Sequence, residues 1–355
     1  MKILHVITSL ATGGAEHLMV DLLPKLRDLG NDVEIAVFKS QYTDFYRQLE
    51  STGILIHGFS QSDGYYNYKH LFRLKKLISH FDIVHTHNTS CQFMAALAKS
   101  PPNILVTTEH STSTRRRNYF FFRPIDRWMY KQYNQIICIS EPSESSLRNY
   151  IGDNYPIITI KNGINVDRFE KANKIDLGLT GNKVVTMVAG FRYEKDQATL
   201  IRSLVNLPEE YHVVLVGDGE KRNEIVSLTK SLNLENRVHM LGVRNDVPQI
   251  LKSSDVVVMS SHREGLSLSN VEGMASGVPF IASDVEGLRE VTGGYGVLFP
   301  HGDDKALANE ILKLTTDHSY SKEIVSKCLL RARQYDISKM AEEYNNIYTK
   351  LGRQV

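Results

Sequence analysis

Short apolar runs rich in Val and Ile alternate with amphipathic stretches along most of this 355-residue chain. The runs are continuously apolar, which is typical of strands buried on both faces of a parallel sheet. The amphipathic stretches between them, such as Ala15–Leu29 and Gln249–Ser253, predict helices. This alternation predicts an α/β fold with parallel sheets wound on both sides. The runs that predict strands are Ile3–Thr8, Val33–Phe38, Ile83–His85, Ile104–Thr108, Ile136–Ile139, Val184–Val188, Val213–Val216, Val238–Leu241, Val256–Ser260 and Pro279–Ile281.

The alternating pattern pauses between about Asn162 and Lys183, where glycine and acidic residues are frequent and a linker is expected. Single cores stop growing at about 250–300 residues, so a chain of this length is expected to form two domains. Both halves show the same strand–helix pattern, which predicts two Rossmann-like, doubly wound domains facing each other across a cleft. In such domains, the loops that follow the strands gather at one edge of each sheet.

Composition narrows the class of protein. Hydrophobic residues make up 42% of the chain and charged residues 23%, which excludes disordered and collagen-like classes. The formal net charge of +2 excludes an overall basic nucleic-acid binder, and no apolar run approaches the roughly 18–20 residues that cross a bilayer. Three widely spaced cysteines, Cys91, Cys138 and Cys328, favour a reducing, cytoplasmic location and predict neither a disulfide framework nor a structural zinc site.

Glycines follow the first predicted strand, in the segment Gly13-Gly14-Ala15-Glu16 that opens the first helix. Glycine lets a backbone approach a ligand closely, and the N-terminus of a helix attracts anions. The segment lacks the spacing of a dinucleotide fingerprint, so an anion-binding loop and a plain strand-to-helix turn both stay open.

Two cations three residues apart, Arg192 and Lys195, follow the strand that opens the second half. A guanidinium and an ammonium at the carboxyl end of a strand suit a diphosphate group. The alternative is a solvated turn in which these cations pair with Glu194 or Asp196.

Two carboxylates eight residues apart, Glu264 and Glu272, frame a loop of Gly and Ser residues that leads into a short helix. Ser269 or Asn270 is the expected N-cap of that helix, and backbone N–H groups at its start can hold a phosphate. A pair of carboxylates also fits a hydrolase with a general acid and a general base. Glu272 alone also fits a favourable charge near a helix N-terminus.

These motifs, in this order and spacing, resemble retaining glycosyltransferases of the GT-B fold, family 4 (group 1), of the bacterial polysaccharide type. The resemblance implies an acceptor-side domain at residues 1–166 and a donor-binding domain at residues 167–337. It also implies a C-terminal helix, 338–355, that crosses back to the first domain. The segments that carry the resemblance are Gly13–Glu16, Asp82–His87, Asn162–Ile164, Val216–Glu220, Leu241–Gly242, Ser254–Asp255, Glu264–Pro279 and Asp284–Glu290.

The resemblance also implies roles for individual residues. Arg192 and Lys195 would hold the donor diphosphate, Glu272 would bind the ribose, and Glu264 would lie beside the donor sugar. His87 would reach the sugar or acceptor from the first domain, with His85 and His110 as rivals. The implied catalytic set is Glu264, Arg192, Lys195 and His87, and the implied donor-binding set is Gly14, Arg192, Lys195, Gly217, Gly242, Val243, Arg244, Glu264, Ser267, Leu268, Ser269 and Glu272.

The implied reaction moves a sugar from a nucleotide diphosphate sugar, with uridine as the expected base, to a lipid-linked or polysaccharide acceptor. Retention would follow from a front-face route, with the departing diphosphate stabilised by the two cations and the helix N-terminus. No Asp-x-Asp motif occurs, so neither a metal nor another cofactor is expected. The alternatives are a nucleotide-sugar epimerase and a non-catalytic nucleotide-sugar binding module on the same fold.

Residues 115–131 contain six cations, six aromatic residues and one acidic residue. Such a stretch suits an anionic lipid surface, single-stranded nucleic acid, or a helix with a buried aromatic face and solvated arginines. The resemblance favours the lipid surface, because many members of the family extend glycans on polyprenyl diphosphate; nucleic acid is not the expected partner. We therefore expect peripheral contact with the inner face of the plasma membrane, and acceptor or membrane contacts at His110, Arg115, Arg116 and Arg117.

Overall fold

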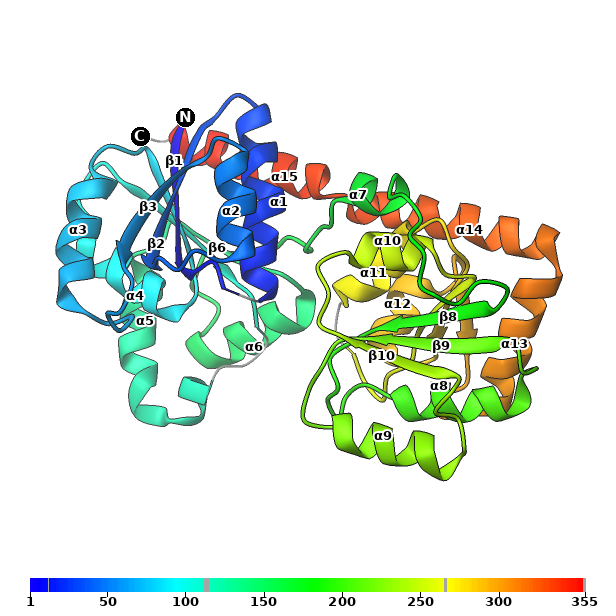
Figure 1. Cartoon of the computed structure of the whole chain (residues 1–355). Coiled ribbons are helices and arrows are strands. Elements are labelled where there is room, and N and C mark those ends of the chain that lie inside the picture. Colours follow the sequence, from blue (N-terminus) through cyan, green and yellow to red (C-terminus); the bar gives the residue numbers. More distant parts are fainter. Residues whose placement is uncertain (12, 112–114, 265–266, 354–355) are drawn as a thin grey trace. The chain divides into compact units, whose positions relative to one another are not determined.

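The computed structural model describes the chain except for residues 12, 112–114, 265–266 and 354–355 (Figure 1). It divides into two compact units: unit 1 comprises residues 1–163 and 337–355, and unit 2 comprises residues 164–336. Each unit contains one parallel sheet with helices packed against it, which confirms the predicted fold class of two doubly wound domains. None of the described helices is both long and apolar enough to span a bilayer.

The seven strands of unit 1 lie in the order β3-β2-β1-β4-β5-β6-β7, and all of these pairs are parallel. Successive residues of β1, such as Ile3 and Leu4, are buried in separate cores on the two faces of the sheet. Helices α1, α2 and α15 contribute to one core, and α3 to α6 contribute to the other. The strands are β1 (Lys2–Ser9), β2 (Asp32–Lys39), β3 (Leu55–Ser60), β4 (Ile83–His87), β5 (Ile104–Glu109), β6 (Gln135–Cys138) and β7 (Ile157–Thr159). The helices are α1 (Gly14–Asp28), α2 (Asp44–Ser51), α3 (Tyr68–Ile78), α4 (Thr89–Ala98), η1 (Arg115–Asn118), η2 (Phe120–Phe122), α5 (Arg123–Lys131), α6 (Glu141–Ile151) and α15 (Ile337–Gly352).

The six strands of unit 2 lie in the order β10-β9-β8-β11-β12-β13, again with parallel pairs. The strands are β8 (Lys183–Val188), β9 (Tyr211–Val216), β10 (Val238–Gly242), β11 (Val256–Met259), β12 (Phe280–Ser283) and β13 (Val297–Phe299). The helices are α7 (Val166–Glu170), α8 (Gln197–Ser203), η3 (Leu204–Asn206), α9 (Arg222–Ser231), α10 (Val247–Lys252), α11 (Leu268–Ala275), α12 (Glu286–Thr292), α13 (Asp304–Thr316), α14 (His318–Ala332) and η4 (Arg333–Tyr335).

The apolar runs do not predict three strands, β3, β7 and β13, all of which lie at sheet edges. These strands are short or partly exposed, so they lack the continuous apolar run that marks interior strands. The expected linker between Asn162 and Lys183 is wrong. Most of that segment belongs to unit 2, where it forms α7 and where Ile164 pairs with Asp336 through a β-bridge.

The C-terminal helix α15 returns to unit 1, as the fold-class prediction requires. Its two tyrosines, Tyr344 and Tyr348, are fully buried in the unit 1 core. The Tyr348 hydroxyl is 2.5 Å from Nδ1 of His85, and the Tyr344 hydroxyl is 2.9 Å from Oγ1 of Thr108. These polar contacts to β4 and β5 fix the rotation of the helix on the sheet.

Truncation of Tyr348 to Ala is expected to lower the free energy of unfolding by about 3–5 kcal/mol, because it opens a cavity in the core. Tyr348→Phe is expected to cost less, about 1–3 kcal/mol, since it only leaves His85 Nδ1 without its partner. Urea denaturation measures both losses. Leu330→Ala, at a side chain that is 62% exposed, is the control and should stay within about 0.5 kcal/mol of the parent. Equal stability of all three variants would contradict the role of α15.

Candidate active site

The loops after β8, β9 and β10 are hydrogen bonded to one another at the carboxyl edge of the unit 2 sheet. Phe191 N–H donates to the Asp218 carbonyl at 3.0 Å, and Gly217 N–H donates to the Gly242 carbonyl at 2.8 Å. Gly217 has a φ of +131°, and a Cβ at this position would overlap the carbonyl of Ala189. Glycine is therefore required here, because only its backbone allows the two loops to approach this closely.

Lys195 and Glu264 form an ion pair in which the two side chains are 17% and 14% exposed. A short antiparallel contact brings them together, with a β-bridge between Lys195 and Ser261. On either side of this bridge, Asp196 N–H donates to the Ser260 carbonyl at 3.0 Å and His262 N–H donates to the Glu194 carbonyl at 2.9 Å. Backbone pairing thus joins the loop after β8 to the loop after β11.

The solvated-turn alternative requires Glu194 or Asp196 to form an ion pair with Arg192 or Lys195, but both carboxylates have other partners. Glu194 lies 3.6 Å from Arg263, and Asp196 caps α8 by accepting from the Thr199 N–H at 3.1 Å. Arg192 is exposed, and no ion pair between it and a described carboxylate is present. The pKa of Lys195 is lowered to about 8, first by burial and second by the positive charge of Arg192. At neutral pH the ammonium form still predominates.

Helix α11 begins two to three residues earlier than the sequence predicts. Its N-cap is Ser267, not Ser269 or Asn270, and the first hydrogen bond of the helix runs from the Asn270 N–H to the Ser267 carbonyl at 3.1 Å. The N–H groups of Leu268 and Ser269 precede that ladder and lie in the first turn, where the helix dipole favours an anion.

Glu272 is half-buried in α11, one turn after Leu268 and therefore on the same face of the helix. The next residue, Gly273, has no room for a Cβ, which would overlap the ring of Phe280. This contact holds α11 close to the sheet and thereby fixes the position of its N-terminus relative to the strand ends.

Three further residues predicted to bind the donor lie at the end of β10 or directly after it. Gly242 has a φ of +68°, and Val243 is 69% exposed. Arg244 donates to both carboxylate oxygens of Asp246, at 2.8 and 2.7 Å. The side chain of Val243 is therefore presented to solvent, while that of Arg244 is held by an acidic neighbour.

Unit 1 carries the remaining predicted residues at the carboxyl ends of its strands. Gly14 is the exposed first residue of α1, with open space where a Cβ would lie. His87 ends β4 and is hydrogen bonded on both sides, by Nε2 to Nδ1 of His5 at 3.0 Å and by Nδ1 to Nε2 of His110 at 2.9 Å. The structure thus joins His87 and His110 in one chain, while His85 is bound to Tyr348 and Thr108.

The hydrogen bonds that join His5, His87 and His110 have a preferred direction from donor to acceptor. Nε2 of His5 is buried without a hydrogen-bond partner, and an unpaired lone pair is less costly than an unpaired N–H. We therefore assign the N–H of His5 to Nδ1, so that it donates to His87, which in turn donates to His110. Burial lowers the pKa of His5 to about 3 and of His110 to about 4, and that of His87 well below its usual value. These rings act as neutral hydrogen-bonding groups at pH 7.

His5 is not among the site residues that the sequence predicts. The available signal was its place in the first predicted strand, where one polar residue interrupts an apolar run. In the sheet, β1 pairs with β4 so that His5 lies opposite His85.

Arg116 and Arg117 do not present their charges to lipid, contrary to the prediction for residues 115–131. Arg117 donates to the buried Glu109 carboxylate at 2.9 Å, and Arg116 pairs with the buried Asp126. A buried carboxylate is costly without such a partner, which is why these cations turn inward. The side chain of Arg115 lies outside the described part of the structure.

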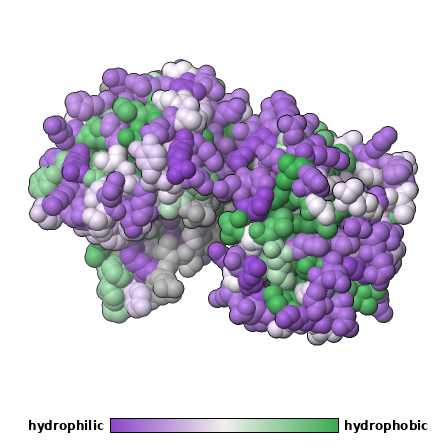
Figure 2. All heavy atoms as spheres, viewed as in Figure 1, coloured by the Kyte–Doolittle hydropathy of each residue, from purple (hydrophilic) through white to green (hydrophobic). Residues whose placement is uncertain are grey.

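Aromatic side chains instead occupy the outer surface of this segment. Phe120 is 87% exposed, and Tyr119, Phe121, Ile125 and Trp128 are also exposed. Hydrophobic residues are visible on the surface over α5 in Figure 2. The charged residues that remain at the surface here are Arg123, Arg127 and Lys131. We use the name aromatic surface for these exposed side chains of this segment: Tyr119, Phe120, Phe121, Arg123, Ile125, Arg127, Trp128 and Lys131.

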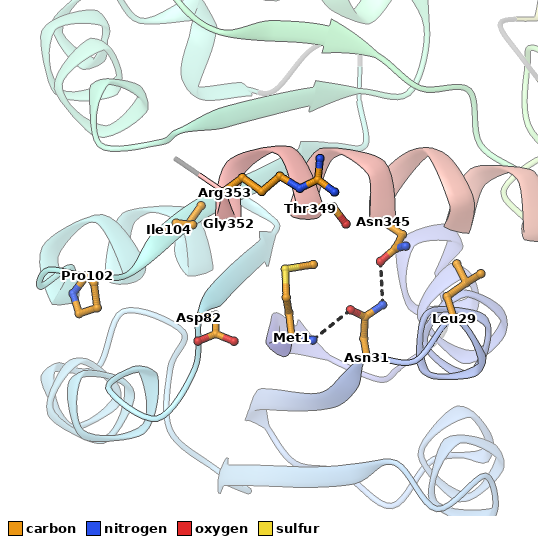
Figure 3. Close-up of a pocket in the computed structure, with 10 residues that line it drawn as sticks. All are labelled: Met1, Leu29, Asn31, Asp82, Pro102, Ile104, Asn345, Thr349, Gly352 and Arg353. Carbon is orange, nitrogen blue, oxygen red and sulfur yellow. Dashed lines mark hydrogen bonds between the residues drawn. The ribbon is translucent and has the colours of Figure 1, made fainter. Parts of the chain in front are cut away.

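A pocket of about 570 Å³ lies at the opposite edge of the unit 1 sheet, where β1, β4 and β5 begin (Figure 3). Among the residues that line this pocket, Asn31 donates a hydrogen bond from its side-chain amide to Oδ1 of Asn345 in α15 at 2.8 Å. Ligands of doubly wound domains bind at the carboxyl ends of the strands, so this pocket is not the candidate active site. The residues that line it are Met1, Leu29, Asn31, Asp82, Pro102, Ile104, Asn345, Thr349, Gly352 and Arg353.

Replacement of Arg117 by Ala is expected to lower the free energy of unfolding by about 3–5 kcal/mol, because it leaves the buried Glu109 carboxylate without its cation. Urea denaturation measures the loss. Lys131→Ala, at an exposed cation of the same segment, is the control and should stay within about 0.5 kcal/mol of the parent. If Arg117→Ala were as stable as this control, the conclusion that Arg117 stabilises the buried Glu109 carboxylate would be wrong.

Two sequence families match the chain: "Glycosyltransferase Family 4" over residues 12–168 and "Glycosyl transferases group 1" over residues 168–328. The UDP-Gal:alpha-D-GlcNAc-diphosphoundecaprenol alpha-1,3-galactosyltransferase of Escherichia coli is 31% identical over an alignment of 273 positions, gaps included, that covers 70% of each chain. The N,N'-diacetylbacillosaminyl-diphospho-undecaprenol alpha-1,3-N-acetylgalactosaminyltransferase of Campylobacter jejuni is 24% identical over an alignment of 365 positions, gaps included, that covers 96% of each chain.

The solved structure of Anabaena Alr3699/HepE in complex with UDP is similar in fold, with a TM-score of 0.79 at 24% identity over 99% of this chain and 100% of that one. This likeness confirms the GT-B fold. The family matches favour a glycosyltransferase over the epimerase and the non-catalytic binding module. On these grounds the chain belongs to glycosyltransferase family 4 (group 1), and it is a glycosyltransferase.

Proposed function

We propose that this chain transfers a sugar from a UDP-sugar to a lipid-linked acceptor in cell-surface glycan synthesis, with retention at the anomeric carbon. The names of the two sequence relatives specify acceptors linked to diphosphoundecaprenol, and the Anabaena protein binds UDP. The observation that carries the proposal is the Lys195–Glu264 ion pair, which is followed within a few residues by the N-terminus of α11.

The donor diphosphate binds between the two cations and the backbone N–H groups at the start of α11. Arg192 supplies an exposed guanidinium, Lys195 supplies a largely buried ammonium, and α11 offers the N–H groups of Leu268 and Ser269, with Ser267 at the cap. These groups stabilise the charge that develops on the departing diphosphate, so no metal is required for this step. Glu272, one turn into α11, accepts hydrogen bonds from the ribose.

The remaining residues of unit 2 complete donor recognition. Gly217 and Gly242, whose backbones touch, border the uridine together with Val243 and Arg244. Once the diphosphate engages Lys195, the Glu264 carboxylate is released to orient the hydroxyl groups of the donor sugar. Unit 2, residues 164–336, therefore forms the donor side of the enzyme.

Transfer forms a bond between an acceptor oxygen and the anomeric carbon and breaks the bond from that carbon to the diphosphate. The acceptor approaches from the face that the diphosphate leaves, and its proton passes to the departing phosphate oxygen, which gives retention. Unit 1, residues 1–163 with 337–355, forms the acceptor side. Gly14 closes over the donor phosphates, and His87, aligned by His5 and backed by His110, positions a hydroxyl group.

Lys195→Ala is expected to weaken binding of UDP about 30-fold, since a hydrogen bond to a charged group contributes about 2 kcal/mol. Isothermal titration in EDTA measures the affinity, and release of UDP in the presence of a lipid-linked acceptor measures transfer. Lys230→Ala, at an exposed lysine in the last turn of α9, is the matched control and should bind normally.

The affinity of the parent for UDP is expected to fall as the pH rises above about 8, because Lys195 then loses its proton before the ligand arrives. The fall approaches tenfold per pH unit and is absent from Lys195→Ala. A pH-independent affinity, or a loss of binding in EDTA, would contradict this donor site.

We also propose that the aromatic surface attaches the enzyme to the cytoplasmic face of the membrane that holds its acceptor. Aromatic rings insert at the headgroup boundary, while the exposed Arg123, Arg127 and Lys131 meet anionic lipid. The three cysteines, which are all buried and free, fit a reducing compartment.

The double variant Phe120→Ser/Phe121→Ser is expected to weaken binding to anionic liposomes at least about tenfold, because each inserted ring contributes about 1–2 kcal/mol. Flotation of the protein with liposomes measures the bound fraction. Phe72→Ser, at a ring on α3 that is 68% exposed, is the matched control and should float like the parent. Equal losses in both variants would show that the attachment does not depend on the aromatic surface.

A further inference from the structure

Three loops at the carboxyl edge of the unit 2 sheet bring together one carboxylate and two imidazoles. Asp196 follows β8, His262 follows β11, and His301 follows β13. One ligand atom from each of these residues lies within 4.8 Å of the others. We propose that Asp196, His262 and His301 form a binding site for a divalent transition-metal ion of the zinc class, a site separate from the groups that bind the donor.

The distances are close to those of a zinc site. Nδ1 of His262 is 2.8 Å from Nε2 of His301 and 3.9 Å from Oδ2 of Asp196. Ligand atoms at the corners of a zinc tetrahedron are about 3.3 Å apart, given bonds of about 2.0 Å. The two measured distances differ from this value by about half an ångström, and the third, between Asp196 and His301, is no longer than 4.8 Å. Small movements of the exposed His301 would bring the three ligands into place, with water as the fourth ligand.

Backbone pairing arranges two of the three ligands in advance. Asp196 N–H donates to the Ser260 carbonyl, and His262 N–H donates to the Glu194 carbonyl, so the two segments are held side by side. The Asp196 carboxylate is further fixed because it caps α8 through both the N–H and the hydroxyl of Thr199. Little conformational freedom is lost when a metal engages these two residues.

The cations next to the ligands in sequence have acidic partners. Lys195 is paired with Glu264, and Arg263 lies near Glu194. Asp196 supplies the negative charge that two neutral imidazoles lack. His262 and His301 are exposed, which gives an ion a path from solvent. At present one ring nitrogen of the pair donates to the other; a metal would replace that shared proton, with each ring carrying its proton on the other nitrogen.

Two other histidine groups lack these features. His5, His85 and His87 are also close together, but they are buried, and both ring nitrogens of His85 are already hydrogen bonded. His212 and His239 form a similar pair at 2.9 Å, yet they belong to no group of three ligands among the described residues. This second pair is therefore a matched control.

Titration of the purified, metal-free protein with Co²⁺ tests the proposal. The tetrahedral site is expected to give intense visible d–d absorption that saturates at one equivalent and is displaced by Zn²⁺. His301→Ala is expected to weaken Co²⁺ binding at least about tenfold and to remove the intense bands, because only two ligands remain. His239→Ala should behave like the parent.

A second readout is thermal stability. An ion that joins three loops of the folded state raises the melting temperature by mass action, so Zn²⁺ should stabilise the parent and His239→Ala but not His301→Ala. The proposal is overturned if the parent shows only the weak bands of octahedral Co²⁺, or if both variants lose binding equally. Because Co²⁺ spectra do not depend on UDP, these outcomes are independent of whether the donor site is correctly placed.

Discussion

A parallel sheet buried on both faces can be extended only through crossover helices, and this constraint determines where chemistry occurs in the chain. Each crossover returns the chain to the same end of the sheet, so the carboxyl ends of all strands share one edge. In unit 2 that edge gathers Arg192 after β8, Gly217 after β9, Gly242 at the end of β10 and Glu264 after β11. Residues separated by more than 70 positions therefore become neighbours without any specific attraction between them.

Sharing an edge is not sufficient for catalysis, because loops must also be held still. Main-chain hydrogen bonds perform that task here, both between the loops after β8 and β9 and between the segments around Lys195 and Ser261. The side chains are then free to present charge. A lysine that is mostly buried has little water to lose when an anion arrives, so its electrostatic contribution is larger than that of an exposed cation. The same burial lowers its pKa to about 8, which links donor binding to pH.

Features that depend on the local sequence pattern can be predicted from the sequence. Features that depend on contacts between residues far apart in the sequence cannot. Interior strands were evident because both faces are buried, whereas the edge strands β3, β7 and β13 offered no such run. The spacing of Glu264 and Glu272 identified the loop and helix, but the N-cap moved to Ser267, because several serines there have similar capping preference. The ion pair of Lys195 with Glu264 joins loops 69 residues apart in sequence, and no local pattern encodes that register.

Residues 115–131 show most clearly why composition alone can mislead. Six cations within 17 residues suggest a basic surface, but the count omits Glu109, which lies outside the window, and does not reveal that Asp126 is buried. Both carboxylates are buried, and an unpaired buried carboxylate costs more than the exposure of a phenylalanine. Arg116 and Arg117 therefore turn inward, and the aromatic rings are left on the outside. The surface that results is more apolar than basic, so its attraction to a membrane depends on burial of rings more than on salt-sensitive contacts with lipid headgroups.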